Sequence, residues 1–317
     1  MNGVLLIDKP RGPTSHDVVS GLRRTLRTKR IGHAGTLDPA ATGLLVVLVG
    51  EATKLEPYFS ACDKSYVADV MLGRATDTLD LEGAPTGEVA LDDPAHADLM
   101  SELLDLERTA DADAPTIRRA LAHELARVEQ FPPAFSAIKV DGQRSHARAR
   151  KGERVELPAR PTRVMTARLD SVRFVGPSPI LTVTLDVAKG YYVRAFARDL
   201  GAELGVPAVL SSLRRTKSGP FTLEAALPTT ASLEDLSSRM LDVAVAATRL
   251  LPGRRLTEEG VVRARQGKRI RTEDLHDDDP TGVSPVALLD PAGAELVAIA
   301  EQTEDGLRIL RGFTSAS

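Results

Sequence analysis

The stretch RIGHAGTLDPAATGLLVVLVGEATK, residues 30–54, organises the rest of the chain. A glycine-rich turn in it holds a single carboxylate, Asp38, and an apolar run follows at residues 44–49. Because this run is short and lies between Gly43 and Gly50, it predicts a buried strand rather than a helix. A carboxylate on a constrained loop beside a rigid strand is held in one geometry, so Asp38 is the first candidate for chemistry.

The composition is that of a globular protein with a substantial core. Its 317 residues, 42% of them apolar, can form one large domain and one small domain. The apolar run at residues 4–7 is too short for a signal peptide or a membrane helix. The single cysteine, Cys62, allows neither an internal disulfide nor a zinc site. We therefore expect a cytoplasmic protein in a reducing compartment.

The charges are segregated along the chain although the formal net charge is only −3. Residues 86–130 hold eleven acidic and four basic side chains, whereas residues 131–170 hold nine basic and four acidic ones. A second basic run lies at residues 263–271. Each basic run is either a solvated face or a surface that contacts phosphate groups.

Hydrophobic periodicity predicts a chain of mixed helices and strands. A short apolar segment followed by a turn rich in proline and glycine predicts a strand at residues 3–7. Alternation predicts strands at residues 64–72 and 180–187. A helix begins at Thr14 or Ser15, and its basic flank leads into the Asp38 loop. Another helix is expected at residues 195–204. The transition into it carries a cluster of aromatic and basic side chains: Tyr191, Tyr192, Arg194 and Arg198.

Two further regions have a distinct character. The acidic segment at residues 91–128 has a helical pattern that Pro115 interrupts, and the V-D-G sequence at residues 140–142 predicts a hairpin turn in a basic arm. Beyond Pro252 and Gly253, short strands at residues 286–289 and 295–300 predict a small β-rich domain.

The site residues allow more than one chemistry. The usual nucleotide, phosphate and zinc signatures are absent from the sequence, which favours a reaction without cofactor or metal. Asp38, with a tyrosine and arginines on other strands, could act as nucleophile or base. A pair formed with Asp77 or Asp80 would instead suit a glycosidase-like hydrolase. A non-catalytic RNA chaperone is a third alternative.

Six ordered segments carry a family resemblance: NGVLLIDKPRGPTSHDVV, GHAGTLDPAATGLLVVLVGEATK, KSYVADVMLGRATDTLD, FSAIKVDG, KGYYVRAFARDLG and LRRTKSG. In this order they resemble the bacterial tRNA pseudouridine synthases of the TruB family, over about residues 2–227. The resemblance implies an α+β pseudouridine-synthase fold, with a mixed, mainly antiparallel central sheet flanked by helices. It also implies a catalytic domain at residues 1–250, a basic RNA-gripping arm at about residues 131–154, and a PUA-like RNA-binding domain at residues 251–317.

The same resemblance implies an activity and its residues. The T-loop uridine of transfer RNA, position 55, would be flipped out and isomerised to pseudouridine without cofactor or metal. The protein would act as a monomer. Asp38 would be the essential carboxylate, Tyr66 would stack on the uracil, and Arg194 would pair with Asp38. Other residues would hold the nucleotide or the RNA: His33, Lys9, Lys54, Tyr192, Leu213, Lys139, Arg144 and Arg150.

The sequence departs from the family pattern at several positions. Tyr191 stands where threonine is expected, and Ala195 stands where a small hydroxyl residue is usual. His146 and Arg148 replace expected aromatic residues in the arm, and the acidic segment is longer than expected. We therefore expect an altered pocket edge and an arm that binds RNA more through charge than through stacking.

Overall fold

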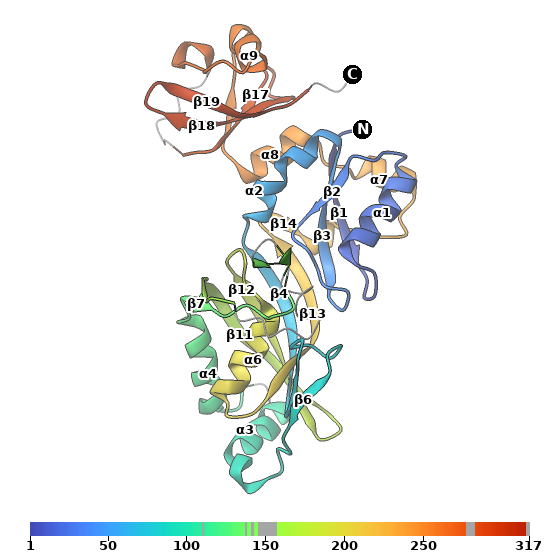
Figure 1. Ribbon diagram of the computed structural model, residues 1–317, viewed down its shortest axis with the longest axis vertical. Helices are drawn as coiled ribbons and strands as arrows, with labels where there is room; N and C mark the ends of the chain where they lie inside the picture. The colour runs from blue at the N-terminus through green and yellow to red at the C-terminus, as the bar shows by residue number, and fades with distance from the viewer. Residues whose placement is uncertain (110, 137, 141–142, 145–156, 277–282, 315–317) are drawn as a thin grey trace. The chain divides into compact units, whose positions relative to one another are not determined.

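The computed structural model describes residues 1–109, 111–136, 138–140, 143–144, 157–276 and 283–314 (Figure 1). The chain forms two compact units. Unit 1 contains Met1–Cys62 and Lys217–Ser317, and unit 2 contains Asp63–Thr216. Each unit has its own hydrophobic core.

Unit 1 is built around the strand predicted from the opening stretch. β3 (Thr42–Val49) pairs antiparallel with β1 (Gly3–Lys9) and β2 (Ile31–Ala34), and β1 also pairs parallel with β15 (Leu227–Pro228). The side chains of residues 44–49 are fully buried, as expected for a strand that is apolar on both faces. The buried strand predicted there is confirmed.

The helix that follows β1 starts at a capping box. Thr14 accepts a hydrogen bond from the backbone of Asp17, whose side chain bonds back to Thr14, and α1 (Ser15–Thr25) follows. Such reciprocal bonds satisfy two N–H groups that a helix start leaves open. Val19 and Leu22 are buried on the inner face of α1.

The carboxyl-terminal part of unit 1 is a β-rich module with a core of its own. Helix α8 (Val243–Leu250) precedes it, so the expected domain boundary near residue 250 falls at the end of a helix. The module pairs four strands around one helix, α9 (Glu258–Arg265). The strands, in sheet order, are β16 (Gly253–Arg255), β17 (Val286–Leu289), β18 (Leu296–Thr303) and β19 (Gly306–Gly312).

Unit 2 is an antiparallel sheet with helices on one face. In sheet order its strands are β11 (Val164–Val175), β12 (Ser178–Val187), β4 (Lys64–Leu72) and β13 (Ala208–Ser218). The helices are α3 (Ala97–Arg108), α4 (Pro115–Leu125) and α6 (Val193–Glu203). Figure 1 shows α4 and α6 side by side next to β11 and β12. The predicted α+β fold with a mixed, mainly antiparallel sheet is confirmed.

The acidic segment folds as two helices, and one of its acids has a defined structural role. The carboxylate of Glu102 on α3 accepts the backbone N–H groups of Thr116, at 3.1 Å, and Ile117, at 3.3 Å. These N–H groups belong to the first turn of α4, which no helical carbonyl can reach. Glu102 therefore replaces the missing N-cap side chain of α4.

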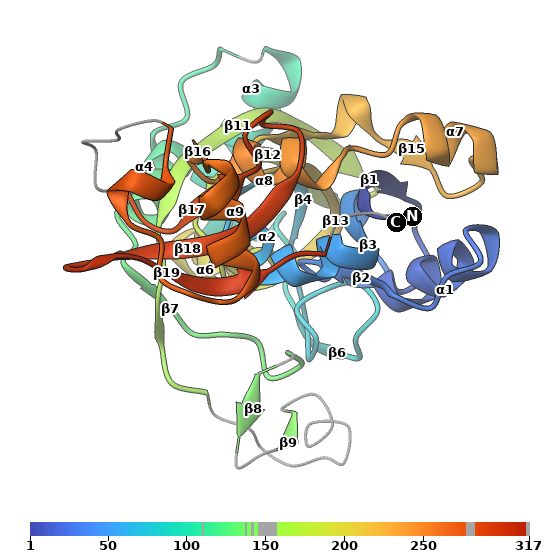
Figure 2. The same ribbon diagram turned by 90° about the horizontal axis from the view of Figure 1, so that it is seen from above.

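A short pair of strands lies on either side of the predicted basic arm in the sequence. β7 (Glu129–Gln130) pairs antiparallel with β10 (Arg160–Pro161), and the predicted hairpin is present as β8 (Lys139–Val140) paired with β9 (Gln143–Arg144). Figure 2 shows this hairpin standing apart from α3, α4 and α6. The turn residues 141–142 and the positions of His146, Arg148 and Arg150 lie outside the described residues.

Candidate functional site

A buried lysine, Lys9, holds the Asp38 loop in place. The ammonium of Lys9, at the end of β1, donates hydrogen bonds to the carbonyls of Pro10 (2.9 Å), Pro13 (2.9 Å) and Pro39 (3.3 Å). Lys9 has no exposed surface, and burying an ammonium is favourable only when such acceptors surround it. Lys9 thus ties the turn after β1 to the residue that follows Asp38.

A second clamp fixes the residue that precedes Asp38. The hydroxyl of Ser15 donates to the Leu37 carbonyl at 3.0 Å and accepts the Leu37 N–H at 2.9 Å. The carbonyl of Asp38 accepts the N–H of Ala41 at 3.1 Å, which closes the turn. Both neighbours of Asp38 are therefore fixed by side chains of other segments, and its half-buried carboxylate lies on a restrained backbone.

His33 and Lys54 both lie near β3, the strand that follows Asp38, but at different positions along it. His33 lies on β2, opposite Val47 of β3, and is half-buried. Lys54 lies beyond the other end of β3 from Asp38, and a strand of eight residues spans about 25 Å. Its position along the chain places Lys54 past the far end of this strand, and a role for Lys54 near the pocket stays a prediction.

The partners of Lys54 give it a different role. Its ammonium donates to Glu51 at 2.6 Å and to the Gly312 carbonyl at 2.8 Å, and it lies 5.3 Å from the ring centroid of Phe313. Glu51 also pairs with Arg30 and accepts the Thr314 N–H at 3.0 Å. These contacts attach the end of β19 to the segment after β3.

Glu51 is the acceptor on which these contacts depend. Its side chain is 7% exposed. Burial alone would raise the pKa of its carboxyl, but the hydrogen bonds from Lys54, from the Thr314 N–H and from Arg30 outweigh burial and lower the pKa to about 2. Glu51 is therefore a charged, fully partnered anchor inside unit 1.

In unit 2, the strand residues predicted for the pocket belong to one apolar cluster. Tyr66 lies on β4 opposite Leu185 of β12, with 9% of its surface exposed. Leu213 lies on β13 and packs against the same cluster as Tyr66. An aromatic ring in this setting is rigid, because the close-packed neighbours leave it few rotamers.

The guanidinium group of Arg194 binds two backbone segments. One terminal nitrogen donates to the Thr78 carbonyl and the other to the Phe135 carbonyl, each at 2.9 Å, and Nε lies 3.8 Å from the Asp80 carboxylate. The five fixed donors of a guanidinium suit such a bridge better than an ammonium would. Arg194, on the first turn of α6, therefore joins the loop after β5 (Arg74–Thr76) to the start of the arm.

Asp77 and Asp80 form the turn that Arg194 holds. Asp77 accepts the Ala84 N–H at 2.9 Å, and Asp80 accepts the Thr78 hydroxyl at 2.6 Å and the Glu82 N–H at 3.1 Å. These are the local bonds by which aspartates stabilise turns. They support the structural interpretation of both acids and give no support to the hydrolase alternative.

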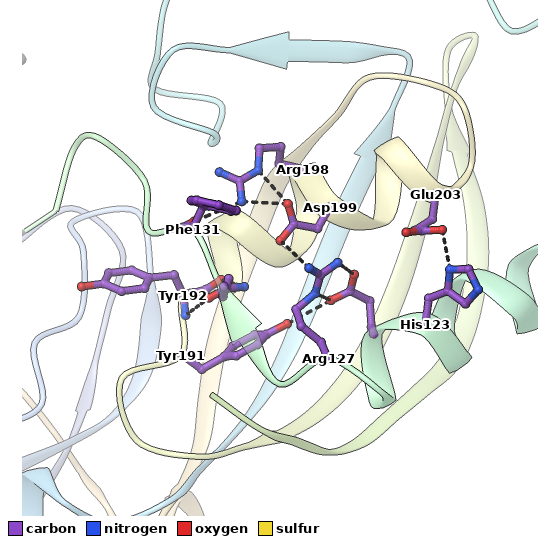
Figure 3. A network of polar contacts seen from close by, with 10 residues as sticks. His123, Arg127, Phe131, Tyr191, Tyr192, Arg198, Asp199 and Glu203 are labelled. Atoms are coloured by element: carbon purple, nitrogen blue, oxygen red, sulfur yellow. Dashed lines mark hydrogen bonds and ion pairs between the residues drawn. The ribbon is translucent and has the colours of Figure 1, made fainter. Parts of the chain in front are cut away.

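The aromatic pair before α6 is held by a polar network, shown in Figure 3. The Tyr191 hydroxyl donates to Glu124 at 3.4 Å, and the Arg127 guanidinium donates two hydrogen bonds to the same carboxylate, at 2.9 and 2.5 Å. Glu124 is fully buried. Burial raises the pKa of the Glu124 carboxyl and of the Tyr191 phenol, and the bond with Glu124 raises the pKa of Arg127.

The network continues from Arg127 to the base of the arm. Asp199 lies 3.9 Å from Arg127 and accepts a hydrogen bond from Arg198 at 2.7 Å. Arg198 also donates to the Phe131 carbonyl at 3.0 Å. Tyr191, one of the residues that depart from the family pattern, is therefore part of a network that spans α4, α6 and the arm.

No pattern in the sequence indicates Ser15, Gln130 or the Phe135 carbonyl as parts of the site. The sequence marks Ser15 only as a possible helix start, and no periodicity or motif distinguishes Gln130. Lys139 and Arg144 lie opposite each other in the β8–β9 hairpin, whereas Arg150 is outside the described residues. Among the described residues, no group of three or more His, Cys, Asp or Glu side chains could hold a metal ion. In the same part of the chain, no helix is long and apolar enough to cross a membrane.

Solved structures share this fold. The chain superposes with a TM-score of 0.68 and 20% identity on a structure described as an H/ACA RNP bound to a substrate RNA containing 2′-deoxyuridine, over 99% of this chain and 85% of that one. It superposes with a TM-score of 0.67 and 20% identity on an archaeal box H/ACA Nop10–Cbf5 complex, over 98% of this chain and 86% of that one. At this identity the likeness concerns the fold alone.

Sequence comparison identifies the family. The profile of the TruB family pseudouridylate synthase N-terminal domain matches residues 23–107 and 92–193, and that of the tRNA pseudouridylate synthase B C-terminal domain matches residues 194–252. The tRNA pseudouridine synthase B of Corynebacterium aurimucosum is 41% identical over 303 residues, 94% of this chain and 95% of the relative. That of Thermobifida fusca is 39% identical over 307 residues, 95% of this chain and 94% of the relative. By both measures, the chain belongs to the TruB family of pseudouridylate synthases.

Proposed function

We propose that this chain isomerises the T-loop uridine of transfer RNA, at position 55, to pseudouridine. In this reaction the N1–C1′ bond breaks, the uracil turns, C5 becomes bonded to C1′ and loses its proton, and N1 gains a proton. The change is redox-neutral, so it requires neither an oxidant nor a reductant. The family membership supports the reaction, and the two clamps around Asp38 are the observation that supports this residue as its carboxylate.

Asp38 is the proposed essential group. It acts by attack on the base, by attack on the ribose or by removal of a ribose proton, and each route needs a carboxylate in a fixed position. The clamps by Lys9 and Ser15 support this requirement, because they restrain the backbone on both sides of Asp38. Tyr66 stacks on the uracil and helps to remove the C5 proton. Arg194 is the third proposed catalytic residue, after Asp38 and Tyr66.

The RNA has to present the uridine outside its stack. Extraction of a stacked base costs roughly a few kcal/mol, which stacking on an aromatic side chain partly offsets. In our proposal His33, Tyr192 and Leu213 contact the flipped nucleotide, while the arm at residues 131–154 and the module at residues 251–317 contact phosphates of the T-arm. A monomer suffices to bind one stem-loop. Because transfer RNA is the proposed substrate, the proposed location of the activity is the cytoplasm.

The test is incubation of the purified chain with an unmodified T-arm stem-loop, followed by a chemical or mass-based assay for pseudouridine. We expect product without added metal or nucleotide, and none from Asp38→Asn, which should bind the stem-loop as tightly as the unaltered chain. Asp92→Asn, the same substitution at an exposed site of unit 2, should remain active. Turnover by Asp38→Asn would refute the assignment, and tight binding without product in the unaltered chain would favour an RNA chaperone.

A further inference from the structure

Gln130 makes two hydrogen bonds to the backbone of one residue, Tyr192. Its side-chain nitrogen donates to the Tyr192 carbonyl at 3.2 Å, and its side-chain oxygen accepts the Tyr192 N–H at 3.0 Å. The amide side chain thus pairs with Tyr192 as a residue of a neighbouring strand would. Because Gln130 is only 3% exposed, water competes little for either bond.

The helix fixes Tyr192 at its carbonyl but not at its N–H. It is the residue before α6, with an extended backbone (φ −107°, ψ 106°) and no side-chain cap. Its carbonyl also accepts the Phe196 N–H at 3.1 Å, the first bond of the helix, whereas its N–H points outside the helix and bonds to Gln130. Gln130 therefore restrains the backbone at the entry to α6, on which the direction of the Tyr192 side chain depends.

Gln130 is itself held in place from two sides. Its strand β7 pairs with Arg160 of β10, and the next carbonyl along the chain, that of Phe131, accepts a hydrogen bond from Arg198. Arg198 is oriented by Asp199, at 2.7 Å. A side chain that is to fix another residue must have a fixed backbone of its own, and Gln130 meets this condition.

The preceding residue, Tyr191, is fixed by its side chain instead. Its hydroxyl bonds to the buried Glu124, which Arg127 neutralises. In Figure 3 the Tyr191 ring points toward Arg127, whereas the Tyr192 ring points away from the network. Consecutive residues of an extended segment alternate in this way. The network thus holds Tyr191 by its ring and Tyr192 by its backbone.

We propose that Gln130 is a positioning residue, which sets the orientation of Tyr192 toward the flipped uridine. This inference rests on the proposed function, in which Tyr192 lines the uridine pocket. Gln130 acts through the backbone of Tyr192 and contacts no reacting atom.

Two substitutions separate orientation from packing. Gln130→Met keeps the side-chain length and removes both hydrogen bonds, and Gln130→Ala removes the side chain altogether. With enzyme in saturating excess over the stem-loop, we expect the single-turnover rate to fall about tenfold in both variants, since small misplacements of a positioning group have effects of this order. The dissociation constant of the stem-loop should change less than about threefold, because phosphate contacts supply most of the affinity.

His123→Gln is the matched control. His123 lies on α4 and contacts Glu203 of α6 at 2.6 Å, so its substitution perturbs the same pair of helices at an exposed contact. This variant should keep the rate of the unaltered chain. Circular dichroism at the assay temperature verifies that each variant is folded.

Hydrogen exchange provides a readout that does not depend on turnover. The Tyr192 amide should exchange faster in Gln130→Met and at an unchanged rate in His123→Gln. Unchanged exchange in Gln130→Met would overturn the inference even in an inactive protein. An unchanged single-turnover rate, or a loss confined to RNA affinity, would also overturn it. An inactive unaltered chain would refute the proposed function, and with it any role of Gln130 toward uridine, while faster exchange would still support the backbone restraint.

Discussion

The ammonium of Lys9 donates a hydrogen bond to the carbonyl of Pro39, the residue that follows Asp38, at 3.3 Å. The bond connects positions that are thirty residues apart in the sequence. Lys9 is fully buried, so its charge acts on the loop and is not presented to solvent. The geometry of the Asp38 turn therefore depends on the end of β1.

Lys9→Met should slow product formation without abolishing RNA binding. The substitution leaves three carbonyls without this donor, and an unsatisfied buried acceptor costs about 1–3 kcal/mol. We expect a lower melting temperature and a rate of product formation reduced by about 10- to 100-fold, because the Asp38 turn loosens. Thermal unfolding and the pseudouridine assay measure the two effects. Lys29→Met, at an exposed lysine of the same unit, should change neither, and a fully active Lys9→Met would contradict the clamp.

Glu51 should make the stability of unit 1 depend on pH in the acidic range. Its pKa is lowered from 4.5 to about 2 in the folded chain, so the folded state binds this proton less readily than the unfolded state does. The contribution of Glu51 to folding stability is complete above pH 4.5 and is lost as the pH falls toward 2. A pKa displacement of this size corresponds to about 3 kcal/mol of folding stability.

Glu51→Gln isolates this contribution. At pH 7 the variant should unfold at a lower temperature than the unaltered chain, because Lys54 and Arg30 lose their charged partner. Between pH 4.5 and 2 the two melting temperatures should converge, as the carboxyl of the unaltered chain becomes protonated. A constant difference over that range, measured by calorimetry, would show that Glu51 is not the titrating group.

Glu102→Ala should destabilise unit 2 and leave catalysis intact. The substitution removes the acceptor for the first N–H groups of α4, and loss of an N-cap costs about 1 kcal/mol. Asp105→Ala, on the same helix, removes only an exposed pair with Arg108 and should change stability by less than about 0.5 kcal/mol. Denaturant unfolding compares the variants, and equal stabilities would remove the capping role from Glu102.

The arm should bind RNA through charge. If Lys139, Arg144 and Arg150 contact phosphates, each change to alanine should reduce by about one the slope of the logarithm of the binding constant against the logarithm of the salt concentration. Binding of the unmodified stem-loop at several salt concentrations measures the slope. Arg108→Ala, at an exposed residue of α3, serves as the control. An unchanged slope in all three arm variants would exclude the arm from the RNA interface.

Local sequence determined much of the fold. Residues 44–49 form a buried strand because they are apolar on both faces, and Thr14 begins a helix because its hydroxyl can cap one. Strands β8 and β9, where the sequence predicts a hairpin, pair antiparallel. The helix predicted at residues 195–204 starts two residues earlier in the structure, at Val193. These features depend on neighbours in the chain, so a short window of sequence contains the information that specifies them.

Tertiary structure alone decided how the candidate residues are held. Lys9 is buried among backbone carbonyls, Lys54 contacts Glu51 and Gly312 instead of the Asp38 loop, and Gln130 bonds to the backbone of Tyr192. Each of these contacts joins a side chain to a backbone group, except that of Lys54 with Glu51. Backbone groups are chemically alike at every position, so no sequence pattern shows which of them a distant side chain will reach. The sequence determined the family and the essential carboxylate that we propose, and the packing of the chain determined what fixes that carboxylate in place.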